Sequence, residues 1–180
     1  MGKILDEITD EMQIWMQQQK MFFVATSPLS VTGHINCSPK GMDTFRILDK
    51  HSVCYMDLTG SGIETTAHLK ENGRIVVMFC AFDGPPNIAR LHGTGVVSNT
   101  GNEFEELKKL FPSNPGIRSI IKINVSRVST SCGFAVPLYD FKADRQVLND
   151  WAAKKSPKEL SEYRQQKNSK SIDGLQGLSQ

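Results

Sequence analysis

Short apolar segments of strand length recur along most of this chain, and they constrain its fold more than any other feature. The two longest, MFFVA at residues 21–25 and IVVMFCAF at residues 75–82, are too short to span a membrane. Further strand-like runs, separated by turn residues, cover residues 34–38, 45–48, 51–58, 90–98 and 117–128. The runs do not alternate with helices as a parallel sheet would require. The sequence therefore predicts six or seven mainly antiparallel strands in a small β-barrel with flanking helices.

Two of these runs carry features of a particular place in the sheet. Residues 74–82 are nearly all apolar and predict a central strand that is buried on both faces. Residues 90–98 predict its antiparallel partner, in which Gly93 and Gly95 indicate a β-bulge or the close approach of a ligand. A lone GxG is too weak a motif to indicate a dinucleotide site by itself.

Helical periodicity is found at the N-terminus and in two connections. Apolar residues at helical spacing between Ile4 and Trp15 predict an amphipathic helix over residues 2–19. Connecting helices are expected at residues 62–72, before the C-terminal cap residue Gly73, and at residues 103–111.

The C-terminal part of the chain also predicts helices. Residues 144–163 favour two helices that are separated at Ser156, a capping residue, and Pro157, a residue suited to a first helical position. We expect one domain over residues 1–180, with the barrel at about residues 21–136 and a helical tail at about residues 141–170.

Composition excludes several classes of partner. The net charge is only +2, and the basic residues that gather between residues 142 and 170 lack the interleaved aromatic residues of a nucleic-acid surface. No signal peptide or membrane span is visible, so we expect a cytoplasmic protein with neither nucleic-acid nor membrane partners. The cysteines are far apart and predict free buried thiols; they are Cys37, Cys54, Cys80 and Cys132.

The most informative polar motif is TGSGIETTAHLKEN at residues 59–72, a glycine-containing turn that leads directly into a helix. N–H groups at a helix N-terminus lack intrahelical partners and carry partial positive charge, so this motif suits a phosphate. Lys40 and Arg46 precede the turn and would add charge-assisted hydrogen bonds if the fold brings them near it. An ordinary N-cap by Ser61 or Thr65, with two solvated cations, explains the same residues equally well.

Other catalytic patterns are weak. The chain has no GxSxG motif for nucleophilic hydrolysis, and its four histidines show neither HExxH nor any other close ligand spacing, so no metal site is expected. His68 is the histidine of interest, because it follows the turn and would reach a cofactor from the first turns of the helix.

Residues 36–84 resemble the flavin-binding core of the pyridoxamine 5′-phosphate oxidase-like family, the split β-barrel flavoproteins. The resemblance rests on NCSPKGMDTFRIL followed by VCYMDLTGSGIETTAHLKENGRIVVMFCAFDGPP. TSCGFAVPLYDF at residues 130–141, and WAAKK and KNSKSIDGL in the tail, are similar to one branch of that family. Together these stretches extend from about residue 21 to about residue 175.

The resemblance implies a homodimer that binds FMN in two grooves at the subunit interface, with both chains contributing to each site. In the family a cation-bearing strand and the turn-to-helix element hold the phosphate, and the isoalloxazine ring lies along strand backbones. Simple sheet packing is the alternative for the strand residues. The cofactor-binding residues expected on these grounds are Lys40, Arg46, Ile47, Leu48, Tyr55, Met56, Asp57, Ser61, Gly62, Glu64, Thr65, Thr66 and His68.

The activity that the resemblance implies is FMN-dependent oxidation or reduction of a small organic molecule, pyridoxamine or pyridoxine 5′-phosphate being one candidate. This chain departs from the oxidase at Glu64, Thr65 and Thr66, where the oxidase has an Arg-Lys pair, and the oxidase's C-terminal substrate motif is not recognisable. No catalytic residue is therefore assigned. The alternative is a non-catalytic split-barrel module, or one that binds haem or a deazaflavin, since a fold does not fix a function.

Overall fold

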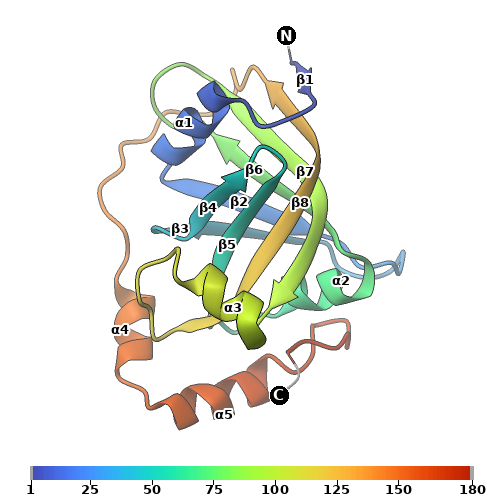
Figure 1. The fold of residues 1–180 in the computed structure, drawn as a ribbon, viewed down its shortest axis with the longest axis vertical. Coiled ribbons are helices and arrows are strands. Elements are labelled where there is room, and N and C mark those ends of the chain that lie inside the picture. The colour runs from blue at the N-terminus through green and yellow to red at the C-terminus, as the bar shows by residue number, and fades with distance from the viewer. Residues whose placement is uncertain (1, 179–180) are drawn as a thin grey trace.

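The computed structural model describes residues 2–178 and shows an antiparallel sheet curled into a half-barrel, with helices around it (Figure 1). Within these residues the strands follow one another in the order β3-β2-β6-β7-β8-β5-β4, and β1 pairs with β8 outside this path. The predicted fold class is confirmed. The strands are β1 (Ile4–Leu5), β2 (Met21–Thr26), β3 (Asn36–Gly41), β4 (Phe45–Asp49), β5 (Ser52–Leu58), β6 (Arg74–Cys80), β7 (Ile88–Ser98) and β8 (Ile117–Ser131).

The main core fills the inside of the curled sheet. Alternate residues of the strands point inward, so Val24, Val77, Leu91 and Ile121 are fully buried in one cluster. Helix α1 (Asp10–Gln18) closes one end of this cluster with its buried methionines. Because burial of apolar area is the dominant favourable term in folding, this alternation determines which face of each strand turns inward.

A second cluster lies on the other side of β5. Helix α3 (Gly101–Lys108) packs Phe104 and Leu107 against Met56 of β5 and Ile120 of β8. Strand β5 is consequently covered on both faces. The prediction that residues 74–82 would be buried on both faces is wrong, because residues 74–79 alternate between positions that are buried and positions that are exposed or partly exposed.

The N-terminal segment differs from the predicted helix over residues 2–19. Helix α1 begins only after Thr9, whose side chain accepts a hydrogen bond from the Met12 N–H at 3.3 Å. Ile4 and Leu5 form β1 against β8. The long strand β8 offers them an edge with unpaired backbone groups, and a two-residue extension satisfies these groups. Helical spacing alone does not reveal that edge.

The remaining predicted helices are present, although several of their bounds differ from the predicted ones by a few residues; helix α3, for example, was predicted at residues 103–111. Helix α2 (Glu64–Asn72) ends at Gly73, whose φ of 73° is the left-handed conformation of a C-terminal cap. In the tail, α4 (Val147–Ala153) is followed by α5 (Pro157–Lys167), which has Ser156 as its cap and Pro157 at its first position, as predicted. The structure adds a capping box, in which the Glu159 side chain accepts from the Ser156 N–H. Residues 132–146, called the strap below, run without regular structure along one side of the molecule (Figure 1).

The predicted bulge is present in β7, where the register with β8 shifts between His92 and Gly93. A Cβ atom on Gly93 would overlap the carbonyl oxygen of Asn124. Glycine is therefore required here because the backbone of β8 lies close to Gly93. All four cysteines are free, but Cys37 and Cys132 are exposed, in contrast to the expectation of buried thiols.

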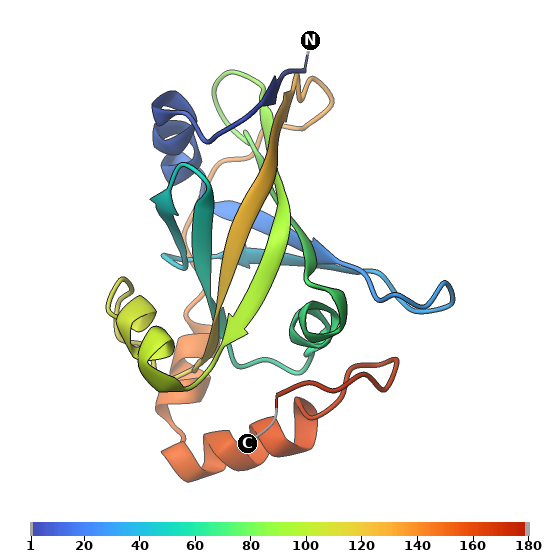
Figure 2. The same cartoon turned by 45° about the vertical axis from the view of Figure 1, so that its right-hand side comes forward.

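Two peripheral segments complete the arrangement. Figure 2 shows the loop between β2 and β3 extending away from the barrel. Both views place the chain that follows α5 next to α2. Among the described residues, none of the helices has the length and apolar character needed to cross a lipid bilayer.

Candidate functional site

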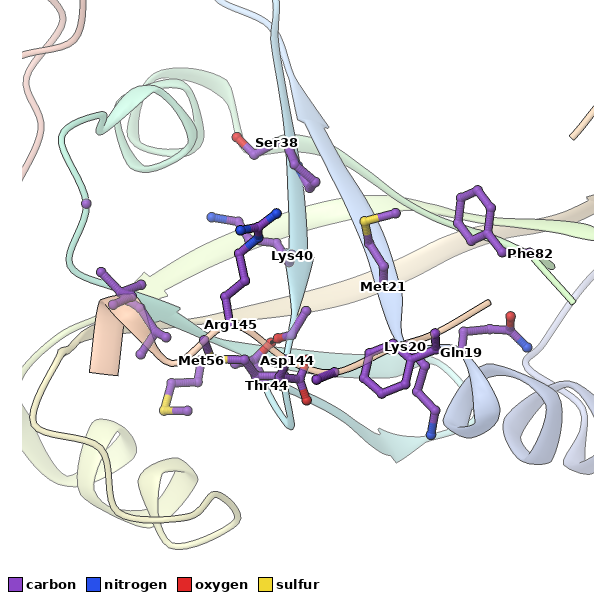
Figure 3. A pocket seen from close by; sticks show the side chains of 18 of the residues that line it. Gln19, Lys20, Met21, Ser38, Lys40, Thr44, Met56, Phe82, Asp144 and Arg145 are labelled. Carbon is purple, nitrogen blue, oxygen red and sulfur yellow. Dashed lines mark hydrogen bonds between the residues drawn. The ribbon is translucent and has the colours of Figure 1, made fainter. Parts of the chain in front are cut away.

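A cavity of about 660 Å³ runs along β3, between the start of β2 and the start of α2 (Figure 3). This volume is within the range of pockets that hold small ligands and cofactors. The walls come mainly from residues 18–21, from β3, from the turn before α2, and from residues 139–148 of the strap and α4, and Met56, Phe82 and Arg118 add to them. Four segments that are distant in the sequence therefore meet at one site.

Basic and apolar side chains line different parts of this cavity. In Figure 3, Lys40 and Arg145 lie on one side, and Met21 and Phe82 lie on the other. Tyr139 of the strap is held next to Phe82, with ring centroids 5.7 Å apart and a hydrogen bond of 2.8 Å from its N–H to the Phe82 carbonyl oxygen. One region thus offers positive charge to an anion, and the other offers aromatic and apolar surface to a planar ring.

A buried ion triad supports the basic region. Asp57 is 1% exposed, and its carboxylate accepts from Lys40 Nζ at 3.1 Å and from Arg118 Nε at 2.7 Å. Burial by itself would raise the pKa of Asp57, but the charges and hydrogen bonds of Lys40 and Arg118 outweigh it, so the pKa lies below its ordinary value. The triad fixes both cations at the cavity wall.

A β-bulge directs Arg118 into this triad. In the pairing of β5 with β8, Asp57 lies opposite Ser119 and Leu58 lies opposite Ile117, so Arg118 is the extra residue of the bulge. The alternating pattern of residues 117–128 predicted the strand but not this irregularity. Arg118 was consequently missed by the sequence prediction, which took its two cations from residues nearer the turn.

The turn before α2 presents an uncapped helix N-terminus. The N-cap residue is Ile63, and no side chain caps the helix, so the alternative of a cap by Ser61 or Thr65 is not what the structure shows. Arg118 Nη1 donates to the carbonyl oxygens of Gly60 at 3.3 Å and Gly62 at 2.8 Å. Because these carbonyls are bound to a cation, their negative ends are neutralised next to the cavity.

Of the residues predicted from the sequence, five line the cavity: Lys40, Met56, Gly62, Glu64 and Thr65. Asp57 lies directly behind Lys40 in the triad. The other seven do not line it; they are Arg46, Ile47, Leu48, Tyr55, Ser61, Thr66 and His68. A cofactor-binding role stays a prediction for the whole set.

Arg46 is engaged elsewhere. Its guanidinium forms a bidentate pair with Asp43, donates from Nε to the Leu110 carbonyl oxygen at 2.8 Å, and lies 4.8 Å from the centre of the Phe111 ring. These contacts fasten the end of the α3 region to β4. Spacing along the chain could not distinguish this structural role from phosphate binding.

Three of the predicted residues are buried in the core with a polar atom that has no partner among the described residues: the Tyr55 hydroxyl, Thr66 Oγ1 and His68 Nε2. His68 Nδ1 lies 3.0 Å from Thr26 Oγ1. Burial lowers the pKa of His68, against the opposing influence of nearby carboxylates. Burial, together with the Asp57 charge, raises the pKa of Tyr55 well above its ordinary value. Both side chains are therefore neutral near pH 7.

We expect His68 to make the fold less stable in mild acid. A histidine whose pKa is lower in the folded state binds more protons when unfolded, so stability falls as the pH drops below the unfolded value of about 6.5. Urea unfolding at pH 7.5 and at pH 5.5 measures the loss, and the loss should be smaller in His68→Gln. His51→Gln is the control, because His51 is exposed in the turn between β4 and β5. A loss in His68→Gln equal to that of the unmodified protein would contradict the assignment.

The comparisons with known proteins agree with this geometry. Residues 8–132 match the family model described as pyridoxamine 5′-phosphate oxidase. The chain therefore belongs to the pyridoxamine 5′-phosphate oxidase family. It is also similar to the pyridoxamine 5′-phosphate oxidase family protein ustO of Aspergillus flavus, with 40% identity over 191 residues that cover 96% of this chain and 76% of that protein.

Solved structures share the fold of this family member. HupZ of Group A Streptococcus, in a tagged variant form, is 25% identical, has a TM-score of 0.57, and matches 69% of this chain and 99% of its own. A putative pyridoxamine 5′-phosphate oxidase of Lactobacillus delbrueckii is 14% identical with a TM-score of 0.53, over 69% of this chain and 94% of its own. The match to the family model ends at residue 132, so α4, α5 and all of the strap after its first residue lie outside it.

Proposed function

We propose that this member of the family binds FMN and uses it to oxidise or reduce a small organic molecule. The observation that carries the proposal is the cavity, in which Lys40, Arg118 and the uncapped start of α2 lie in the same site as Phe82 and Tyr139. FMN has an anionic phosphate and a planar aromatic ring, and it needs a basic region and an apolar region within one pocket.

The polar groups of the cavity fit a phosphate. Arg118 Nη2 has no hydrogen-bonding partner among residues 2–178, although the other guanidinium nitrogens are engaged. Asn36 Nδ2 donates to Thr65 Oγ1 at 2.9 Å, so the Thr65 hydroxyl is left to donate its own hydrogen elsewhere. Lys40, Arg118 and Thr65 would hold the phosphate, and the helix N-terminus would favour its charge.

Bound FMN would supply two-electron redox chemistry, and the chain's part is to bind, orient and shield it. Lys40 and Arg118 would fix one end of the cofactor, because the triad with Asp57 holds their positions. Tyr139 and Phe82 would form an apolar wall that excludes water from the ring. No side chain of the cavity is required as a nucleophile for this chemistry.

We infer that the protein acts as a homodimer, as its resemblance to the family implies. Large apolar side chains gather in the strap and at the start of α4, where Phe134 is 81% exposed and Leu138 is 75% exposed. Exposed apolar patches on soluble proteins mark interaction sites, and this patch borders the cavity. Light scattering of the purified protein should give double the mass of one chain, and a monomer at micromolar concentration would contradict the inference.

The cofactor is tested by an absorbance spectrum of the protein as purified, followed by titration with FMN. We expect the two visible flavin bands, or saturable quenching of flavin fluorescence on titration. A colourless protein without saturable FMN binding would overturn the proposal. An intense Soret band would support the haem-binding alternative, which the structure does not favour because His68 is buried and does not line the cavity.

The reaction is tested separately once flavin binding is established. Pyridoxamine 5′-phosphate incubated with the protein and oxygen should yield pyridoxal 5′-phosphate if the family's named activity applies. Absence of turnover with this substrate would leave FMN binding intact and would direct the search to other small molecules.

A further inference from the structure

The turn before α2 is held from outside the cavity by the chain that follows strand β8. The residues involved, 164–178, form the end of α5 and the segment after it, and the match to the family model does not reach them. Asn168 is the central residue of this contact, because it is fully buried although it is polar. A buried amide costs free energy unless all its polar atoms are bonded, so its partners identify its role.

Both polar atoms of the Asn168 side-chain amide form hydrogen bonds at the turn. Nδ2 donates to the Gly60 carbonyl oxygen at 2.9 Å, and Oδ1 accepts from Arg118 Nη1 at 3.0 Å. Arg118 in turn binds the carbonyls of Gly60 and Gly62. Asn168 thus joins the turn and the cation that neutralises it into one network.

The backbone of Asn168 is fixed as well. Its N–H donates to the Arg164 carbonyl oxygen at 2.7 Å, and its carbonyl accepts from the Leu178 N–H at 2.9 Å. Gly177 packs so closely that a Cβ atom there would lie 2.9 Å from Ile63, the N-cap residue of α2. Lys70 of α2 donates to the Gly177 carbonyl oxygen. The segment therefore contacts α2 near both of its ends.

Arg164 adds a second connection from the same tail. Its Nε donates to Thr59 Oγ1 at 2.9 Å, and its Nη2 donates to the Ile117 carbonyl oxygen at 2.8 Å. Thr59 precedes the turn, and Ile117 precedes Arg118. The tail consequently holds the turn and the start of β8 in a fixed relation.

We propose that Asn168 is a positioning residue for the anion-binding turn, so that the C-terminal tail preorganises the phosphate site. The turn contains Gly60 and Gly62, and glycine has the largest conformational freedom of any residue. Without Asn168 the turn samples more conformations, and binding must then order it at a cost in affinity. This inference rests on the proposed binding of FMN, and it adds that residues outside the family match set its affinity.

The experiment compares FMN with riboflavin, which has the same ring but no phosphate. In Asn168→Ala we expect the affinity for FMN to fall about tenfold, equal to about 1.4 kcal/mol, with riboflavin affinity changed less than about twofold. If Asn168 had only a structural role, its replacement would lower the affinities for FMN and for riboflavin alike. Arg164→Ala removes a partly buried side chain of the same network, and we expect it to lower FMN affinity too. This variant replaces Asn168→Ala in the test if Asn168→Ala does not fold.

Asn72→Ala is the matched control. Asn72 also bridges two segments through both ends of its amide, donating to the Ser27 carbonyl oxygen and accepting from the Arg74 N–H, but at the far end of α2. We expect the ratio of FMN to riboflavin affinity to be unchanged in Asn72→Ala. An unchanged ratio in Asn168→Ala would overturn the positioning role alone, whereas failure of the unmodified protein to bind FMN would overturn the proposed function and this role with it.

Discussion

Asp57→Asn is expected to destabilise the protein by about 3 kcal/mol, since it removes the one anion between two cations without changing the size of the side chain. Arg118 is 7% exposed and would be left with an uncompensated buried charge, while Lys40, at 23% exposed, can still reach water. Breaking a buried ion pair from one side is among the costliest single substitutions. Urea unfolding at pH 7 measures the difference.

The pH dependence of this effect has a definite sign. The pKa of Asp57 is lower in the folded state, so its stabilisation is fully present above the unfolded value of about 3.9 and is lost as the pH falls further. The difference in stability between Asp57→Asn and the unmodified protein should therefore start to shrink as the pH falls below about 4, and it should vanish only below the lowered folded pKa. Asp43→Asn is the control: Asp43 pairs with Arg46 at an exposed position, and we expect a loss of about 1 kcal/mol or less. Equal losses in the two variants would contradict the role of the triad.

Lys40→Met is expected to lower FMN affinity by about 1.5–3 kcal/mol, the usual range for a hydrogen bond to a charged group. The substitution keeps the length of the side chain but removes the ammonium from the cavity wall. Asp57 retains Arg118 as a partner, so the fold should tolerate the change. Fluorescence titration with FMN measures the affinity, and riboflavin binding should be nearly unaffected because it lacks the phosphate.

Two further variants test whether the effect of Lys40→Met on FMN affinity is specific to the cavity. Lys158→Met, on the outer surface of α5, should leave FMN affinity unchanged. Arg46→Met tests the cation that the sequence predicted and that one protomer does not bring to the cavity. Unchanged affinity would confine the phosphate site to Lys40, Arg118 and the turn, whereas a clear loss would place Arg46 in a site completed by the second subunit.

Local signals in the sequence predicted much of the fold because they act over a few residues. The C-terminal cap at Gly73 and the N-terminal cap at Ser156 depend only on their immediate neighbours, and both are present as predicted. The same reasoning failed for the N-terminus, where the edge of β8 overrode helical periodicity at Ile4 and Leu5. A pattern cannot indicate an edge that another part of the chain creates.

The sequence by itself determined the antiparallel strands and the turn that leads into α2, and it singled out Lys40, which lines the cavity. The tertiary structure decided which charges meet there. A bulge opposite Asp57 brings Arg118 to it across 61 residues, and the folding of the tail brings Asn168 to Gly60 across 108 residues. Helix propensities and helix caps depend on residues that are near one another in the chain. Ion pairs and buried amide hydrogen bonds depend on strand register and packing, which exist only once the chain has folded.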